Sequence, residues 1–183
     1  MRISIRQFTL FCYYPFRYYK NPQKIPLFMP TRNAQDLPKS GKIIALDVGE
    51  KTIGVAMSDG MRMIAQPVTT LKYVKFGIVR DALHELSTKE QATCFVVGLP
   101  LHMSGDMSSS ADRAMSFAHQ LESDTGLPVL LWDERMTTMA AENALFEQRQ
   151  GRQKRASKRD IKEQIDNVAA ALILQGVLDL LRN

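Results

Sequence analysis

Four acidic residues stand where their carboxylates could share one site. Asp47 and the pair Asp133-Glu134 each directly follow a short apolar run, and Asp166 lies in an apolar helical pattern near the C-terminus. An ionised carboxylate is costly to bury alone, so several acids that converge need a partner, and a divalent cation suits oxygen ligands best. The chemistry to consider first is therefore that of a metal site.

Each acid taken alone also has a structural explanation. Asp47 could form an Asx turn at the end of a strand. Asp133 could cap the helix that follows it, and Asp166 could be an early helical acid stabilised by the helix dipole. The joint occurrence of these acids at the ends of separate elements favours a functional reading over three independent structural ones.

The elements that would position the acids follow from the hydrophobic pattern. A buried strand over 43–46, an alternating strand over 52–58 and a third strand over 64–70 predict an antiparallel meander. Two further buried strands, over 93–98 and 129–132, alternate with helices and should lie parallel to the first. Helical periodicity predicts four helices, over 74–88, 111–121, 138–148 and 160–181. In the first of these, the expected apolar face is formed by Ile78, Leu83 and Leu86, with Val79 and Ala82. We expect an α/β fold: a five-stranded mixed sheet with helices on both faces.

The same elements predict how the acids could meet. Parallel strands end at one edge of a sheet, so Asp47 and the Asp133-Glu134 pair should lie together there. On the last helix, Asp166 shares a face with the apolar residues at 169, 170, 173 and 177, and the two alanines at 169 and 170 would let this helix approach the sheet closely. Because side chains alternate along a strand, only one of Asp133 and Glu134 can face inward, and we favour Glu134.

Composition limits the protein to one ordinary globular domain: 183 residues, 45% hydrophobic and 23% charged. The net charge of +5 arises in residues 1–28, which hold five basic residues and no acid. Removing those five from the 24 basic residues leaves 19, equal to the 19 acidic residues. Nucleic-acid binding must therefore depend on a local patch rather than on overall charge.

Such a patch precedes the last helix. The segment 149–162 holds one acid and seven basic residues, namely Arg149, Arg152, Lys154, Arg155, Lys158, Arg159 and Lys162. We expect it to contact a polyanionic backbone, although a solvated loop is the alternative. Lys51, in the turn after Asp47, and Arg135, next to the acidic pair, are further candidates for binding nucleic acid.

The N-terminal 40 residues read as a leader outside the domain, which we expect to span 41–183. Residues 1–28 are aromatic and proline-interrupted, with no span long enough for a membrane and no signal-peptide cleavage pattern. We expect that translation starts at Met29 and that residues 1–28 are not made. The two cysteines, Cys12 and Cys94, indicate no disulfide framework, so a cytoplasmic protein is expected.

Other catalytic chemistries lack their motifs. The chain has no G-x-S-x-G, no Cys-His arrangement and no H-E-x-x-H. The three histidines are scattered: His84 and His119 should lie on solvated helix faces, and His102 lies in a loop that could touch phosphate.

Four motifs, in order and spacing, resemble those of the YqgF/RuvX family: ALDVGEKTIGVAMSD (45–59), VVGLPLHMSG (96–105), WDERMTT (132–138) and QIDNVAAALILQ (164–175). The resemblance covers the chain from Lys42 to its end. It implies a ribonuclease-H-like fold and a nuclease that matures the 5′ end of pre-16S rRNA in ribosome biogenesis or resolves Holliday junctions. His102, Ser104 and Thr52 depart from the usual family residues, which puts specificity in question more than chemistry.

The resemblance also implies a site and its cofactors. Asp47, Asp166 and Glu134 or Asp133 correspond to the metal-binding and catalytic acids. Two Mg²⁺ or Mn²⁺ ions, roughly 3.5–4 Å apart, would be bridged by Asp47; one would activate water and the other would stabilise the leaving oxygen. The implied partner is precursor ribosomal RNA or branched DNA, with no membrane, and the chain could act as a monomer or a homodimer.

Two other classes of protein fit parts of the pattern. A non-catalytic RNA-binding or transcription-associated factor could keep the fold, but retention of all the candidate acids weighs against it. An ATPase or sugar kinase of the actin-like superfamily would share the D-x-G hairpin, but such proteins use two such domains and this chain has one copy.

Overall fold

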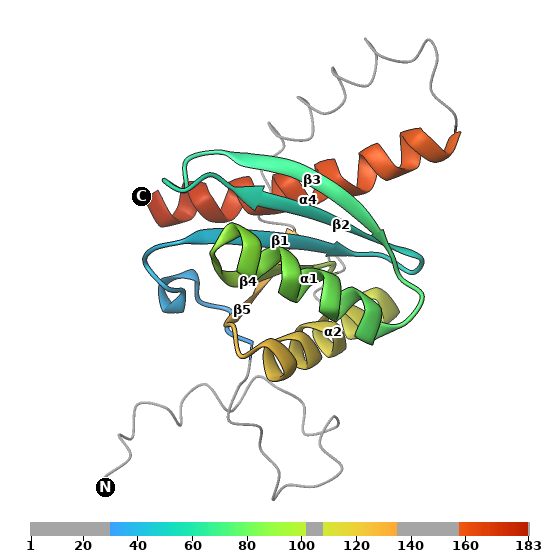
Figure 1. Cartoon of the computed structure of the whole chain (residues 1–183), viewed down its shortest axis with the longest axis horizontal. Helices are drawn as coiled ribbons and strands as arrows, with labels where there is room; N and C mark the ends of the chain where they lie inside the picture. The colour runs from blue at the N-terminus through green and yellow to red at the C-terminus, as the bar shows by residue number, and fades with distance from the viewer. Residues whose placement is uncertain (1–29, 102–107, 135–157, 183) are drawn as a thin grey trace, which may run out of the picture.

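A computed structural model of the chain describes residues 30–101, 108–134 and 158–182 (Figure 1), with the side chains of residues 158–167 left out of the description. The helix expected over 138–148 and the loop that contains His102 and Ser104 lie outside these residues.

One mixed five-stranded sheet forms the centre of the domain, in the order β3-β2-β1-β4-β5. β1 pairs antiparallel with β2 and β2 antiparallel with β3, while β1, β4 and β5 run parallel. The predicted meander and the two parallel strands are thus confirmed. The strands are β1 (Lys42–Val48), β2 (Thr52–Ser58), β3 (Ala65–Lys72), β4 (Ala92–Leu99) and β5 (Val129–Asp133).

Three described helices cover the two faces of the sheet (Figure 1). Helices α1 (Phe76–Glu90) and α2 (Ser109–Thr125) pack on one face, and α4 (Lys158–Arg182) packs on the other. Local chemistry sets the ends of α2. The Ser108 side chain caps its N-terminus by accepting a hydrogen bond from the Ala111 N–H, and Gly126 ends it with a left-handed backbone.

The alternation of side chains along β1 divides the core into two clusters. Ile44, Leu46 and Val48 pack in the cluster beneath α1 and α2, whereas Ile43 and Ala45 pack in the cluster beneath α4. Because both faces are covered, β1 is apolar at every buried position, which is why its sequence reads as a continuous run rather than as an alternating one.

One core expectation on α1 is wrong. Ile78 was placed on the buried face, but its side chain is 60% exposed. The residues of α1 that do face the core include Val79 and Leu83, four positions apart on one stripe of the helix, and Leu86 packs partly buried against the same cluster. Ile78 lies one residue away from that stripe, a rotation of about 100° that turns it toward solvent.

Part of the N-terminal stretch expected to lie outside the domain packs onto it. The Thr31 N–H donates to the Val129 carbonyl and the Leu131 N–H donates to the Thr31 carbonyl, at 2.9 and 2.8 Å. Ala34 and Leu37 are buried in the cluster beneath α4. This stretch thus covers the outer edge of β5, a contact that two isolated apolar residues do not reveal as a pattern in the sequence.

In the part of the chain that is described, no helix combines the length and the apolar character needed to cross a bilayer.

Candidate active site

Asp47 lies on the α4 face of the sheet, near the end of β1. Ile43 and Ala45, two and four positions earlier, are buried in the cluster beneath α4, and alternate residues of a strand share a face. Asp47 pairs in register with Gly54 of β2. Because Gly54 has no side chain, β2 contributes only backbone there, and the Asp47 side chain is half-buried.

Glu134 reaches the same face from β5. Leu130 and Trp132 are buried in the cluster beneath α4, whereas Val129 and Leu131 belong to the opposite cluster. Glu134 continues the first series and Asp133 the second. The structure therefore places Glu134 on the face that Asp47 occupies, and Asp133 at the strand end on the other face.

Gly98 of β4 provides the space that the Glu134 carboxylate occupies. A Cβ added at Gly98 would lie 2.6 Å from Glu134 Oε1 and 2.6 Å from Cδ1 of Ile173 in α4. Both distances are shorter than carbon contacts allow, so only glycine fits without a shift of the strand, the carboxylate or the helix. The role of Gly98 was not foreseen, although a glycine inside the buried strand sequence V-V-G-L is a known sign of close approach.

Electrostatics connect the three acids at the strand ends. Burial, the charge of Asp47 and the charge of Asp133, in that order, raise the pKa of Glu134 to about 7. All three causes act in the same direction. Such a site favours an added positive charge, because a cation among the carboxylates would relieve both the repulsion and the cost of burial.

The donor chemistry of the site fits a divalent cation. Asp47 and Glu134 present hard carboxylate oxygens on one face, next to a glycine that leaves the strand backbone bare. Within the described ranges, no group of three or more His, Cys, Asp or Glu side chains is arranged to hold a metal ion. A complete site would thus need a further ligand, and the side chain of Asp166 is outside that description.

The remaining predicted site residues are placed only in part. Asp166 belongs to α4, four positions before the fully buried Ala170, and its approach to Asp47 stays a prediction. Lys158 and Arg159 begin the same helix, with their side chains undescribed. The other predicted cationic contacts lie outside the described residues: Arg135, Arg149, Arg152, Lys154 and Arg155.

Lys51 is exposed in the tight turn that joins β1 to β2, at the edge of the sheet where Asp47 lies. The Gly49 N–H donates to the Thr52 carbonyl at 3.0 Å, and a Cβ at Gly49 would lie 2.8 Å from that oxygen. The Lys51 carbonyl accepts a hydrogen bond from the Tyr73 N–H. The turn therefore places the positively charged Lys51 at the end of the sheet that carries Asp47, Asp133 and Glu134, which we call the acidic edge.

The two described histidines, His84 and His119, lie on the helices that cover the opposite face of the sheet. His84 is exposed on α1, as expected. His119 was also expected on a solvated face, but it is half-buried on α2, and burial lowers its pKa. Its neighbours Phe117 and Ala118 are buried, so the apolar face of α2 is wide enough to shield part of the imidazole.

The family model and the curated relatives that match this chain point to the same family. Residues 41–180 match the model of the RuvX family, described as a Holliday junction resolvase. A Paracoccus denitrificans protein named "Putative pre-16S rRNA nuclease" is 44% identical over 149 residues, which cover 81% of this chain and 90% of that protein. A protein of the same name from Agrobacterium fabrum is 43% identical over 148 residues, covering 81% and 89%.

Among solved structures, Thermus thermophilus RuvC in complex with a Holliday junction substrate superposes with a TM-score of 0.51 at 12% identity. The likeness covers 76% of this chain and 96% of that one. At this identity the comparison concerns the fold alone, and it agrees with the ribonuclease-H-like sheet that was expected.

Proposed function

The chain belongs to the RuvX family, and from this membership and the geometry of its acidic edge we propose that it is a metal-dependent nuclease that hydrolyses phosphodiester bonds. The observation that supports this most strongly is the position of Glu134 above Gly98, with Asp47 close enough for its charge to raise the pKa of Glu134. A buried glutamate kept next to other carboxylates destabilises the protein unless a cation compensates it. That cost suits a functional site better than a structural one.

The proposed ligands are Asp47, Glu134 and Asp166. Mg²⁺ or Mn²⁺ ions held there would lower the pKa of the attacking water and balance the charge that builds on the phosphate. The chain's own residues orient the ligands: β1 fixes Asp47, Gly98 leaves room for Glu134, and α4 packs against the sheet through Ala170 and Ile173. Asp133, on the other face, would act through its charge rather than as a ligand.

The substrate we propose is the 5′ end of pre-16S rRNA, acted on in the cytoplasm during ribosome biogenesis. The curated relatives, at 43–44% identity, carry the name "Putative pre-16S rRNA nuclease". Holliday junction DNA is the second candidate, because the family model is described by that activity. The RNA or DNA backbone would be held by Lys51 at the described edge and by Arg135, Arg152, Lys154, Arg155, Lys158 and Arg159 in and near the basic segment.

A side-by-side cleavage assay distinguishes these substrates. Wild-type protein is incubated with Mg²⁺ and either a pre-16S rRNA fragment or a four-way DNA junction, and Glu134→Gln protein serves as the control for contaminating nucleases. The proposal expects cleavage of the RNA by the wild type and not by the variant. Cleavage of the junction alone would favour the second substrate. If Glu134→Gln cleaved either substrate as well as the wild type does, the proposed site would be contradicted. ATP hydrolysis by the wild type without cleavage would favour an ATPase or sugar kinase of the actin-like superfamily.

A further inference from the structure

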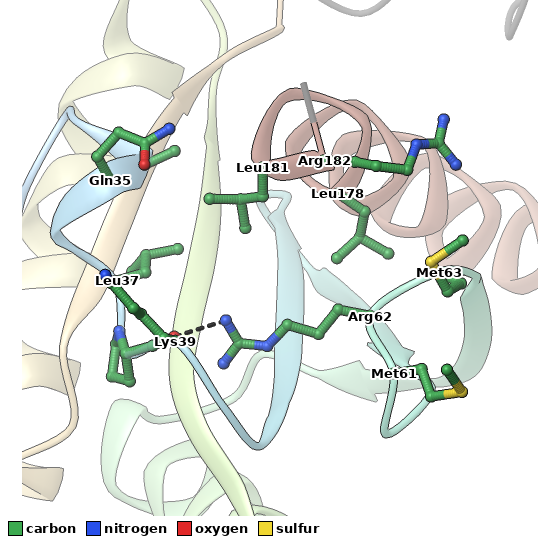
Figure 2. A pocket seen from close by; sticks show the side chains of 11 residues that line it. Gln35, Leu37, Lys39, Met61, Arg62, Met63, Leu178, Leu181 and Arg182 are labelled. Carbon is green, nitrogen blue, oxygen red and sulfur yellow. Dashed lines mark hydrogen bonds between the residues drawn. The ribbon is translucent and has the colours of Figure 1, made fainter.

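A cavity of about 400 Å³ lies at the end of the sheet opposite the acidic edge (Figure 2). It is bordered by the C-terminal part of α4, by the turn between β2 and β3, and by the N-terminal stretch that covers β5. Seven apolar residues line it: Ala34, Leu37, Pro38, Met61, Met63, Leu178 and Leu181. Figure 2 shows the two leucines of α4 on one side and Met61 on the other.

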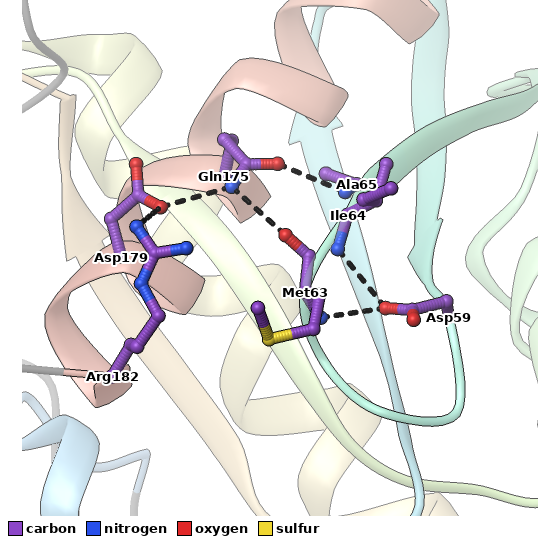
Figure 3. A network of polar contacts seen from close by, with 7 residues as sticks. All are labelled: Asp59, Met63, Ile64, Ala65, Gln175, Asp179 and Arg182. Atoms are coloured by element: carbon purple, nitrogen blue, oxygen red, sulfur yellow. Dashed lines mark hydrogen bonds and ion pairs between the residues drawn. The ribbon is translucent and has the colours of Figure 1, made fainter.

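The turn that carries the methionines is held firmly in place (Figure 3). The Asp59 carboxylate accepts hydrogen bonds from the N–H groups of Met63 and Ile64, at 2.6 and 3.0 Å. The Gln175 side chain of α4 accepts from the Ala65 N–H at 3.0 Å and donates to the Met63 carbonyl. These bonds hold the turn in one conformation. Its apolar side chains face solvent, because Met61 is 82% exposed and Ile64 is 57% exposed.

The cavity is positively charged. Lys39, Arg62 and Arg182 line it, and among its described lining residues none is acidic. The Arg62 guanidinium donates to the carbonyls of Pro38, Ser40 and Gly41, which carry no net charge, so its positive charge is not neutralised. Arg182 forms an ion pair with Asp179 at 3.1 Å. An excess of positive charge therefore surrounds the apolar lining.

We propose that this surface binds a peptide segment of a partner protein that presents an apolar side chain flanked by acidic residues. The methionines offer an adaptable apolar contact, and the volume accommodates one large side chain. The chain's own residues 1–28 carry the wrong charge, with five basic residues and no acid. A nucleic acid would match the charge but not the apolar lining.

Binding at this surface would leave the proposed nuclease site accessible. The cavity adjoins the start of β1, where Arg62 binds Gly41, whereas Asp47 lies near the other end of the strand. At about 3.3 Å per residue, this separation is about 17–20 Å. The proposal stands independently of the substrate that the acidic edge cleaves.

The test is selection from a displayed library of random 16-residue peptides on the full-length chain, followed by affinity measurement with the enriched peptides. Met61→Glu and Lys39→Glu alter the cavity at exposed positions. Ile78→Glu and Lys89→Glu make the same chemical changes on α1, on the opposite face of the sheet. We expect enriched peptides in which acids flank an apolar residue, bound about tenfold more weakly by each cavity variant and within about twofold of the wild type by each control.

Three results would overturn the proposal. One is that no peptide with a Kd below about 100 µM emerges from the selection. Another is that the enriched peptides bind the cavity variants as tightly as the wild type. The third is that a 12-nucleotide RNA competes with the peptides and that its binding is weakened by Lys39→Glu but not by Met61→Glu. That result would assign the surface to nucleic acid instead.

Discussion

The carboxylate of Glu134 lies directly over Gly98, so close that a methyl group at position 98 would come within 2.6 Å of Oε1. The two residues belong to different strands and stand 36 positions apart in the chain. Gly98 is thus the residue that lets a carboxylate from the end of β5 reach the α4 face above β4, toward Asp47.

Gly98→Ala should damage both activity and stability. The added Cβ would collide with Glu134 and with Ile173 of α4, so the strand, the acid or the helix must shift. We expect the free energy of unfolding to fall by about 1–3 kcal/mol, as for other overpacked cores, and the cleavage rate to fall at least about tenfold. Urea denaturation and single-turnover kinetics measure the two effects.

Gly77→Ala is the matched control. Its Cβ would meet only Arg80 of the same helix, at 3.9 Å, and alanine favours a helix by up to about 1 kcal/mol over glycine. This variant should be at least as stable and as active as the wild type. If Gly98→Ala behaved the same way, close packing at position 98 would have no functional meaning.

Glu134→Gln should stabilise the protein when no metal is present, in a way that depends on pH. The pKa of Glu134 is about 7 in the folded chain against an ordinary 4.5, so the folded state holds an extra proton between these values. The wild type therefore loses stability as pH rises through this window, and the glutamine variant does not. Allowing for partial solvent screening, the variant should be more stable by about 1–2 kcal/mol at pH 8 in EDTA, and equal at pH 4.

Thermal unfolding of both proteins across this pH range provides the check. Glu85→Gln, an exposed substitution on α1, should show no such pH-dependent difference from the wild type. A Glu134→Gln variant less stable than the wild type at pH 8 would mean that Glu134 is stabilised by a partner and is no strained ligand.

Arg62→Lys should destabilise the fold while leaving cleavage unchanged. The planar guanidinium donates to three main-chain carbonyls and to the Thr93 hydroxyl, which ties the turn between β2 and β3 to the stretch 38–41 and to the start of β4. A lysine ammonium cannot reproduce that geometry. We expect a loss of about 1–3 kcal/mol in urea denaturation, and a clearly smaller loss for Arg80→Lys in an exposed ion pair. Equal losses would show that Arg62 contributes only a surface contact.

The basic segment should act through phosphate contacts. Replacing both Arg152 and Lys154 with alanine removes two positive charges from the segment 149–162. If both contact single-stranded RNA, the slope of log K against log salt should become shallower by about 1.4, and binding should weaken for every RNA sequence alike. Filter binding between 50 and 200 mM salt measures this, and an unchanged slope would place both residues away from the RNA.

Much of the fold could be read from the sequence because most elements carry a clear hydrophobic period. The strand ends located Asp47 and the Asp133-Glu134 pair, and alternation of side chains predicted that the two acids of the pair lie on opposite faces of the sheet. The period fails where contacts depend on distant partners. Gly98 matters only because Glu134 and Ile173 approach it in three dimensions.

The other differences have similar causes. Ala34 and Leu37 pack beneath α4 as single apolar residues, and they belong to no periodic hydrophobic pattern that would predict their burial. Ile78 was placed in the core because it is apolar, although a helix with one buried stripe leaves such a residue exposed. His119 was expected in solvent because its side chain is polar, although the residues next to it on α2 are buried.

If Asp47 belongs to a metal-dependent site that hydrolyses phosphodiester bonds, its negative charge is needed for cleavage. The most direct test is the single-turnover cleavage rate of a pre-16S rRNA fragment over a range of Mg²⁺ concentrations for the wild type, Asp47→Asn and the control Glu85→Gln. Asparagine keeps the size of the side chain and removes its charge. We expect a rate at least about 100-fold lower for Asp47→Asn at every Mg²⁺ concentration, with the control within about twofold of the wild type. Cleavage by Asp47→Asn at the wild-type rate would contradict it.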